Sequence, residues 1–171
     1  MKRRCPSTPL LEVHRGCSIY KPSLLTRFVF IGCALAALTL AGNAMAASRW
    51  ETLEAIHAVE NPSNSPRPGR FGELGAYQFR AMTWRMHTSL PFSEAIDRRR
   101  SDEVAVRHYE WLKTTLTRAG VEPSTYNIAL AWNAGANAVI TRRVSSASRN
   151  YAQRVENLAT ALNANSGIAM K

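Results

Sequence analysis

Apolar side chains recur at every third or fourth position through most of the chain after residue 47. This spacing is that of one face of an α-helix, and no segment shows the sustained alternation of apolar and polar residues that marks a strand. The expected helices, in chain order, are 48–61, 76–87, 101–120, 124–135, 136–144 and 151–162. The pattern therefore predicts a mostly α-helical single domain without internal repeats.

Capping residues mark several of these helix boundaries. Ser48 followed by Glu51 has the pattern of a capping box, which predicts the start of the first helix. Ser101 and Ser124 are residues of the type that begins a helix, and each precedes a segment with helical spacing. Gly120 is suited to the end of the helix that begins at Ser101.

The first 46 residues have the order of a secretory signal peptide. A basic region precedes the apolar run 28–40, and the small-residue site 44–46 follows that run. The run is shorter than the roughly 20 residues that span a bilayer, which favours cleavage after residue 46 over a retained anchor. The sequence thus divides into a signal peptide, a domain at 47–162 and a small polar tail at 163–171 that is predicted to be disordered.

Composition narrows the class of the exported protein. All three cysteines lie within the first 46 residues, so the domain has no cysteine nucleophile, thiolate metal site or disulfide scaffold. Residues 47–171 carry 16 Lys and Arg against 11 Asp and Glu, a net charge of +5 of the +10 of the whole chain. Such a domain suits an anionic polymer or an envelope surface, and its charge is too small to predict nucleic-acid binding. The predicted location is the periplasm or the outside of a bacterium.

Glu60 is the most unusual residue of the first predicted helix. In helical projection it falls between Leu53 and Ile56, on the face that should be buried, directly before a loop rich in proline and glycine. Burial disfavours the charged carboxylate and raises its pKa, as a general acid near neutral pH requires. The plainer interpretation is a helix-end carboxylate that hydrogen-bonds the loop or pairs with Arg67 or Arg70.

Glu60 is the first of four motifs that occur in a fixed order. The others are Gly75-Ala76-Tyr77-Gln78, Ala131-Trp132-Asn133-Ala134-Gly135 and Tyr151-Ala152-Gln153-Arg154-Val155. Over residues 51–158 this set resembles the soluble lytic transglycosylase family of the lysozyme superfamily. The eighteen positions from Glu60 to Gln78 agree with the family spacing. The resemblance implies a lysozyme-like fold of the goose-type lysozyme and transglycosylase kind.

The chain departs from the family pattern at three places. Asn61 follows the glutamate where the family usually has Ser, Ala76-Tyr77 replaces Leu-Met, and Trp132 replaces Tyr. Asn61 keeps a polar side chain able to hydrogen-bond a carboxylate, and the aromatic residues keep large groups able to line a sugar groove. These changes bear on subfamily and substrate length more than on reaction class.

The resemblance implies a role for each polar motif residue. Glu60 would act first as acid and then as base in cleaving the MurNAc–GlcNAc β-1,4 bond of peptidoglycan, with formation of 1,6-anhydromuramic acid. Tyr151 would orient Glu60 or stabilise charge beside it, and Gln78 and Asn133 would position hydroxyl and acetamido groups of the sugars. The plainer alternatives are that Gln78 is an amide on a helix surface and Asn133 an amide at a helix end. Tyr151 would then be a core aromatic residue with its hydroxyl at the rim.

Tyr77 and Trp132 would line the sugar groove in the same scheme. At helical spacing, aromatic residues are as often part of the core. The resemblance implies no cofactor, and the four histidines of the chain show no metal-ligand spacing. His57 and His108 fall beside apolar helix positions, so they are interpreted as packing or surface residues.

Glu73 leaves a second mechanism open. It follows Glu60 by thirteen residues, and a second carboxylate in the same cleft would favour hydrolysis, as in goose-type and other lysozyme-like enzymes. The plainer interpretation of Glu73 is a solvated loop residue or a partner for arginine. A third hypothesis is an inactive glycan-binding module of the same fold, which the glutamate at the acid position disfavours.

The expected partners are peptidoglycan glycan strands, bound by a monomer. By analogy of size alone, the protein is also compatible with a secretion or conjugation apparatus. The expected contact with the membrane is through the signal peptide before cleavage. The basic runs 98–100 and 142–143 are interpreted as solvated faces or as contacts to anionic peptide stems and envelope polymers.

Overall fold

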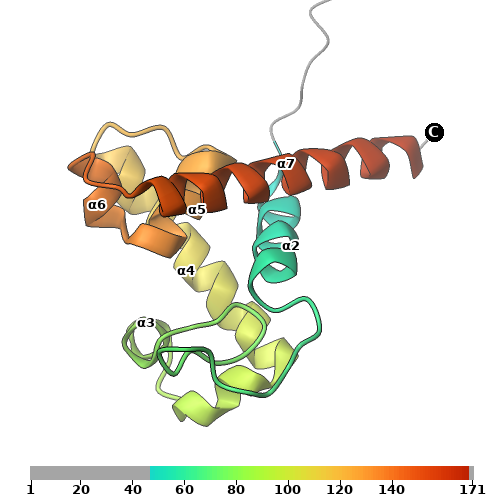
Figure 1. Ribbon diagram of the computed structural model, residues 1–171, viewed down its shortest axis with the longest axis vertical. Coiled ribbons are helices and arrows are strands. Elements are labelled where there is room, and N and C mark those ends of the chain that lie inside the picture. Colours follow the sequence, from blue (N-terminus) through green and yellow to red (C-terminus); the bar gives the residue numbers. More distant parts are fainter. Residues whose placement is uncertain (1–46, 170–171) are drawn as a thin grey trace, which may run out of the picture. The chain divides into compact units, whose positions relative to one another are not determined.

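Helices make up most of residues 47–169, the part of the chain that the structure, a computed structural model, describes (Figure 1). They are α2 (Arg49–Glu60), α3 (Ala81–His87), the 3₁₀ helix η1 (Phe92–Ile96), α4 (Arg98–Arg118), α5 (Thr125–Ala134), α6 (Ala136–Ile140) and α7 (Ser146–Ala169). Within these residues the only β pairing is one antiparallel bridge between Leu74 and Phe79. The prediction of a mostly α-helical fold is confirmed. The predicted signal peptide and its cleavage site lie outside the described residues.

Helix α4 is in contact with most of the other elements. It packs against α2, α3, α5, α6 and η1, whereas α7 packs along α5 and α2. Figure 1 shows α3 and η1 toward the N-terminal end of α4, and α5 and α6 toward its C-terminal end. The largest side chains buried between these elements are Trp84, Tyr77, Ile56, Leu112, Leu116, Ile128, Val104 and Val155. Across residues 47–169, every helix is too short or too polar to cross a lipid bilayer.

Two helix starts follow the capping residues predicted for them. Ser48 accepts a hydrogen bond from the Trp50 N–H at 3.2 Å, and its hydroxyl donates to the Glu51 carboxylate. Ser124 accepts from the Asn127 N–H at 3.3 Å at the start of α5. Both starts are confirmed, because the cap satisfies helix N–H groups that have no partner inside the helix.

Helix α4 begins three residues earlier than predicted, at Arg98 instead of residue 101. Its N-cap is Asp97, whose carboxylate accepts from the Arg100 N–H at 2.8 Å, and not Ser101. Asp and Ser are comparable N-caps, so local chemistry alone does not choose between them. Ser101 is fully buried in the first turns of the helix.

The predicted helix 76–87 is wrong in its first five residues. Gly75 and Gln78 have φ of +78° and +46°, in the left-handed region that a helix cannot contain. Leu74 and Phe79 exchange backbone hydrogen bonds of 3.0 and 2.9 Å across this turn. The chain therefore forms a tight hairpin before α3 begins at Ala81.

The two last helices also differ from the prediction. Helix α6 stops at Ile140, because Arg142 adopts a left-handed φ of +58°. Helix α7 starts at Ser146 and continues through the residues predicted as a disordered tail, as far as Ala169. Extending an existing helix adds one hydrogen bond per residue without a new nucleation cost, so a polar segment without proline can continue it.

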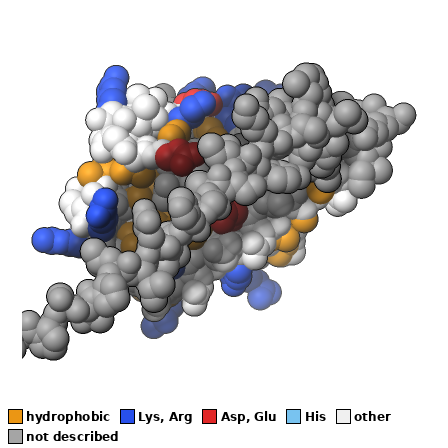
Figure 2. Space-filling model, turned by 90° about the horizontal axis from the view of Figure 1, so that it is seen from above, with side chains coloured by type: hydrophobic (Ala, Val, Ile, Leu, Met, Phe, Trp, Pro, Cys, Tyr) orange, Lys and Arg blue, Asp and Glu red, His pale blue; other side chains and the backbone are white. Residues whose placement is uncertain are grey.

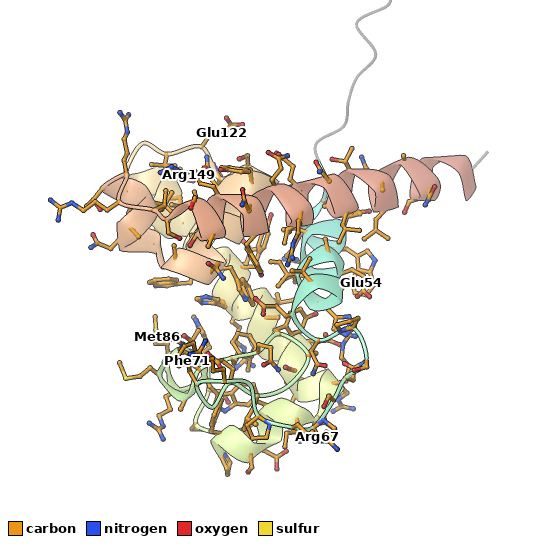
Figure 3. The ribbon with its side chains drawn as sticks, viewed as in Figure 1. Glu54, Arg67, Phe71, Met86, Glu122 and Arg149 are labelled. Carbon is orange, nitrogen blue, oxygen red and sulfur yellow. The ribbon has the colours of Figure 1, made fainter. Side chains whose placement is uncertain are left out.

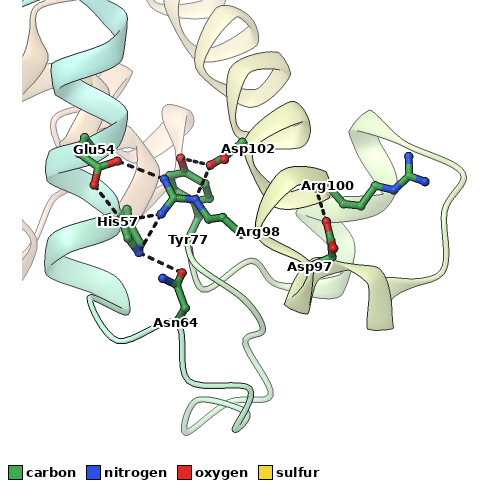
Figure 4. Close-up of polar contacts among 8 residues, drawn as sticks. All are labelled: Glu54, His57, Asn64, Tyr77, Asp97, Arg98, Arg100 and Asp102. Atoms are coloured by element: carbon green, nitrogen blue, oxygen red, sulfur yellow. Dashed lines mark hydrogen bonds and ion pairs between the residues drawn. The ribbon is translucent and has the colours of Figure 1, made fainter.

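A polar network fixes α2 against α4 and the hairpin (Figure 4). Arg98 donates to Glu54 at 3.1 Å and to Asp102 at 2.8 Å, and its guanidinium lies 3.0 Å from His57 Nδ1. Asp102 also accepts from the Tyr77 hydroxyl at 2.7 Å. Because Glu54 and His57 belong to the last turns of α2, the network holds the end of that helix in place.

Candidate active site

A cleft of about 510 Å³ opens beside the C-terminal end of α2. Its lining comes from that helix end, the segment 69–80, α3, α4 and the junction of α5 and α6. The lining residues are Glu60, Gly69, Arg70, Phe71, Glu73, Gln78, Phe79, Arg80, Thr83, His108, Trp132, Asn133, Ala134 and Gly135. The cleft thus brings together five predicted site residues from three separate motifs and the loop: Glu60, Glu73, Gln78, Trp132 and Asn133.

Glu60 is the last residue of α2, and its side chain is half-buried in the cleft wall. Burial raises the pKa of Glu60 above its ordinary value, and the negative charge of Glu73 raises it further. The Tyr151 hydroxyl and Arg154 act in the opposite direction without cancelling these effects. A carboxyl group in this environment retains its proton at a higher pH than an exposed one, as a general acid must.

Tyr151 lies next to Glu60 but is not part of the cleft lining. Its side chain is 8% exposed, and its hydroxyl has no hydrogen-bond partner of ordinary geometry within residues 47–169. It is nevertheless close enough to the Glu60 carboxylate to lower the pKa of that group. Burial and the charge of Glu60 raise the pKa of Tyr151, so the phenol stays neutral. Tyr151 is therefore placed to donate a hydrogen bond to Glu60 when Glu60 ionises.

Asn61 connects the end of α2 to the loop that follows. Its side-chain amide donates to the carbonyl oxygens of Ser65 at 3.0 Å and Gly75 at 3.1 Å, and its carbonyl accepts from the Ser65 N–H at 2.9 Å. The amide is thereby committed to the loop backbone, and the expectation that it would hydrogen-bond the Glu60 carboxylate is not met. Asn61 therefore acts on the site indirectly, by holding the loop against the end of α2.

Glu73 is the second carboxylate of the cleft. It accepts a hydrogen bond from the Phe71 N–H at 2.8 Å, and it lies 3.5 Å from Arg80 Nε. Partial burial acts to raise the pKa of Glu73, but the backbone hydrogen bonds and Arg80 outweigh it and lower that pKa below its ordinary value. The cleft therefore holds one carboxyl group that favours its proton and one that remains ionised.

Aromatic rings form the floor of the cleft around Trp132. The Trp132 ring lies 5.6 Å from Phe79 and 4.7 Å from His108, measured between centroids. His108 also hydrogen-bonds His87 at 2.9 Å and stacks on Trp111 at 5.6 Å. Burial and the proximity of His87 lower the pKa of His108 to about 3, so this histidine is neutral. Phe79 and His108 are only 2% and 7% exposed, so half-buried Trp132 is the ring of this floor against which a sugar face could pack.

Gln78 and Asn133 supply uncharged polar groups to the cleft. The Gln78 amide nitrogen donates to the Gly75 carbonyl at 3.0 Å, which fixes the side chain across the hairpin turn. Asn133 is exposed at the C-terminal end of α5. Both residues are thus positioned where a bound ligand could meet them.

Tyr77 is not where the prediction placed it. Its side chain is 1% exposed, lies in the core and donates its hydroxyl hydrogen to Asp102, while the Arg98 guanidinium lies 5.8 Å from its ring centroid. Phe79, two residues later, is also in the core at 2% exposure, but unlike Tyr77 it is among the residues that line the cleft. The prediction that Tyr77 lines the groove is therefore wrong.

Several cleft residues carried no signal in the sequence. His108 follows the buried face of α4, so its spacing is that of a core residue. Arg70, Phe71 and Arg80 come from the loop and hairpin, whose conformation decides what they face. Among residues 47–169, no three or more His, Cys, Asp or Glu side chains are grouped to hold a metal ion.

Comparison with known proteins identifies no relative. No family model, no curated protein and no solved structure matches the chain. The chemistry of the cleft therefore has to be inferred from its own residues and from the four motifs.

Proposed function

We propose that the protein is an exported peptidoglycan lytic transglycosylase with a lysozyme-like fold and with Glu60 as its single acid and base. The observation that carries the proposal is the Glu60 carboxyl group, whose pKa is raised in a cleft with an aromatic floor and two amide side chains. An acid poised in this way serves to protonate a glycosidic oxygen.

The reaction needs no water in this scheme. Protonated Glu60 gives its proton to the oxygen that bridges the two sugars, and the bond between that oxygen and C1 of the muramic acid breaks. Ionised Glu60, with Tyr151 as hydrogen-bond donor, then takes the proton from the 6-hydroxyl of the same sugar. The 6-oxygen bonds to C1, the 1,6-anhydro ring closes, and Glu60 has regained its proton.

A specific observation favours a second candidate function, hydrolysis. Glu73 lines the same cleft as Glu60 and is ionised when Glu60 is protonated. A cleft with one ionised and one protonated carboxyl group is characteristic of retaining and inverting glycosidases, in which the ionised group acts as nucleophile or base. In the transglycosylase scheme, Glu73 instead stabilises positive charge on the sugar ring and keeps the Glu60 pKa high.

The products of digestion distinguish the two reactions. The purified protein is incubated with peptidoglycan, and the released muropeptides are analysed by mass spectrometry. We expect muropeptides that end in 1,6-anhydromuramic acid, lighter by one water than reducing-end products. Reducing-end products would contradict the transglycosylase and support the hydrolase, and no release from folded protein would count against both.

The pH profile of cleavage should respond to the charges around Glu60 in opposite directions. Cleavage requires protonated Glu60, so the rate falls as the pH rises through the pKa of this group. Glu73→Gln removes a negative charge and should lower that pKa, moving the alkaline limb to lower pH. Arg154→Gln removes a positive charge and should move the limb to higher pH.

The Glu73→Gln variant also tests whether Glu73 takes part in the reaction directly. If Glu73 is the nucleophile or base of a hydrolase, Glu73→Gln lowers kcat at every pH by about 100-fold or more. If instead the alkaline limb of the pH profile shifts while the maximal cleavage rate is nearly unchanged, Glu73 acts on Glu60 only through its charge.

The proposed cellular setting follows from the proposed reaction. The substrate is the glycan strand of the bacterial wall, so the enzyme acts in the periplasm or outside the cell, as a monomer. Clearing a passage for a secretion or conjugation apparatus is one use of such an activity.

A further inference from the structure

Phe71 is exposed at the mouth of the cleft between two guanidinium groups. Its side chain is 70% exposed, and the Cζ atoms of Arg70 and Arg80 lie 5.4 and 5.5 Å from the ring centroid. All three residues line the cleft. Exposed aromatic surface costs free energy in water, so a ring held open here is suited to covering part of a ligand.

The turn that carries Phe71 is held by its own backbone and by Glu73. The Gly69 N–H donates to the Glu73 carbonyl at 2.8 Å, and the Gly72 N–H donates to the Gly69 carbonyl at 3.1 Å. The Phe71 N–H donates to the Glu73 carboxylate at 2.8 Å. The ring is therefore presented on an ordered turn, which reduces the entropy lost on binding.

The two arginines differ in their partners. Arg80 lies 3.5 Å from the Glu73 carboxylate, which offsets part of its charge. Arg70 forms no ion pair within residues 47–169, so its positive charge is available to an anionic group. Figure 2 shows basic side chains projecting at separate points of the face seen from above.

We propose that Arg70, Phe71 and Arg80, here called the mouth clamp, bind the peptide stem carried by the muramic acid. The proposal rests on the proposed function, because it assigns this ligand to a glycan strand in the same cleft. Glu60, Trp132 and Asn133 would contact the sugars, and the substituent on the muramic acid would reach the mouth. There Arg70 pairs with a stem carboxylate, Arg80 adds positive charge, and Phe71 covers the aliphatic part of the stem.

Arg67 provides a matched control for the clamp. It belongs to the same loop and is exposed, but it is not part of the cleft lining. In the view of Figure 3, Arg67 lies apart from Phe71. Arg67→Ala therefore removes the same charge as Arg70→Ala without touching the clamp.

Binding to two forms of the wall tests the clamp independently of catalysis. All variants carry Glu60→Gln, so that turnover does not remove the substrate, and circular dichroism verifies their folding. Affinity is measured for insoluble peptidoglycan with its peptide stems and for glycan strands stripped by an amidase. The stripped strands lack the stem but keep the carboxylate of the lactyl group. They therefore show whether the arginines bind that carboxylate or the stem.

We expect Arg70→Ala to weaken binding to stem-bearing peptidoglycan about 10-fold, the effect of losing one charge-assisted hydrogen bond. Phe71→Ala should also weaken this binding, whereas Arg67→Ala should not, and none of the three should change binding to stripped strands. Equal losses on both substrates, equal losses for Arg70→Ala and Arg67→Ala, or no binding to either substrate would each overturn the proposal. Muropeptide release by the wild-type protein tests the proposed function separately, since cleavage at Glu60 can be observed whether or not the clamp residues contribute to affinity.

Discussion

Glu60→Gln should reduce the release of muropeptides by about 10²–10⁴-fold, the range that a general acid or base contributes. The amide has nearly the shape of the protonated carboxyl group, so the side chain keeps its place beside Tyr151, but it has no proton to give to the glycosidic oxygen. The cleft would still bind glycan. Initial rates of release, followed by chromatography of the soluble products, measure the loss.

Glu103→Gln is the matched control for this prediction. Glu103 is an exposed glutamate of α4 that lies 3.8 Å from Arg99 and is not part of the cleft lining, so its change should leave the rate unaltered. A Glu60→Gln protein that cleaves at a rate near that of the wild type would exclude Glu60 as the acid. Equal losses in both variants would point to a nonspecific effect.

Glu60→Gln should also affect the stability of the fold. The folded state holds the Glu60 proton more tightly than the unfolded state does, because burial raises the pKa. Ionisation of Glu60 therefore costs stability as the pH rises from the unfolded pKa of about 4.3 through the higher folded pKa. The uncharged amide avoids this cost, so the melting temperature of Glu60→Gln at pH 7 should equal or exceed that of the wild type. Lost activity with a retained melting temperature separates catalysis from folding.

Local chemistry explains which parts of the fold and site were predictable. Ser48 and Ser124 begin helices because each cap accepts a hydrogen bond from an N–H group two or three residues away. Such a local interaction can be predicted from neighbouring residues in the sequence. Glu60 was recognisable because a carboxylate on the apolar face of a helix contradicts the rest of its pattern. The desolvation that the pattern implies is the main cause of its raised pKa.

The hairpin explains why other residues could not be placed. Tyr77 and Phe79 are both aromatic, only two positions apart and both buried, but only Phe79 is among the residues that line the cleft. The left-handed φ of Gln78, which shapes this turn, has no signal in a residue type that is common in helices. His108 likewise reaches the cleft only because α4 passes beneath Trp132.

Gly75 shows most directly how a tertiary contact fixes this hairpin. A Cβ atom at this position would lie 1.6 Å from the Ala95 carbonyl oxygen and 3.2 Å from the Ser101 hydroxyl oxygen. The glycine therefore lets the hairpin lie against the end of η1 and the start of α4. It also allows the Gly75 carbonyl to accept hydrogen bonds from Asn61 and Gln78, so the same residue joins the loop, the end of α2 and the cleft.

Gly75→Ala should destabilise the protein by about 2–5 kcal/mol, because left-handed φ costs about 1–2 kcal/mol and overpacking about 1–3 kcal/mol. That is a large part of the 5–15 kcal/mol that is typical of a domain. Gly72→Ala is the matched control, since Gly72 has nearly the same φ of +79° and open space around its Cα. It should lose only about 1–2 kcal/mol, the cost of the left-handed backbone. Urea denaturation of both variants measures the difference, and equal losses would mean that the approach of the hairpin to Ala95 does not limit the fold.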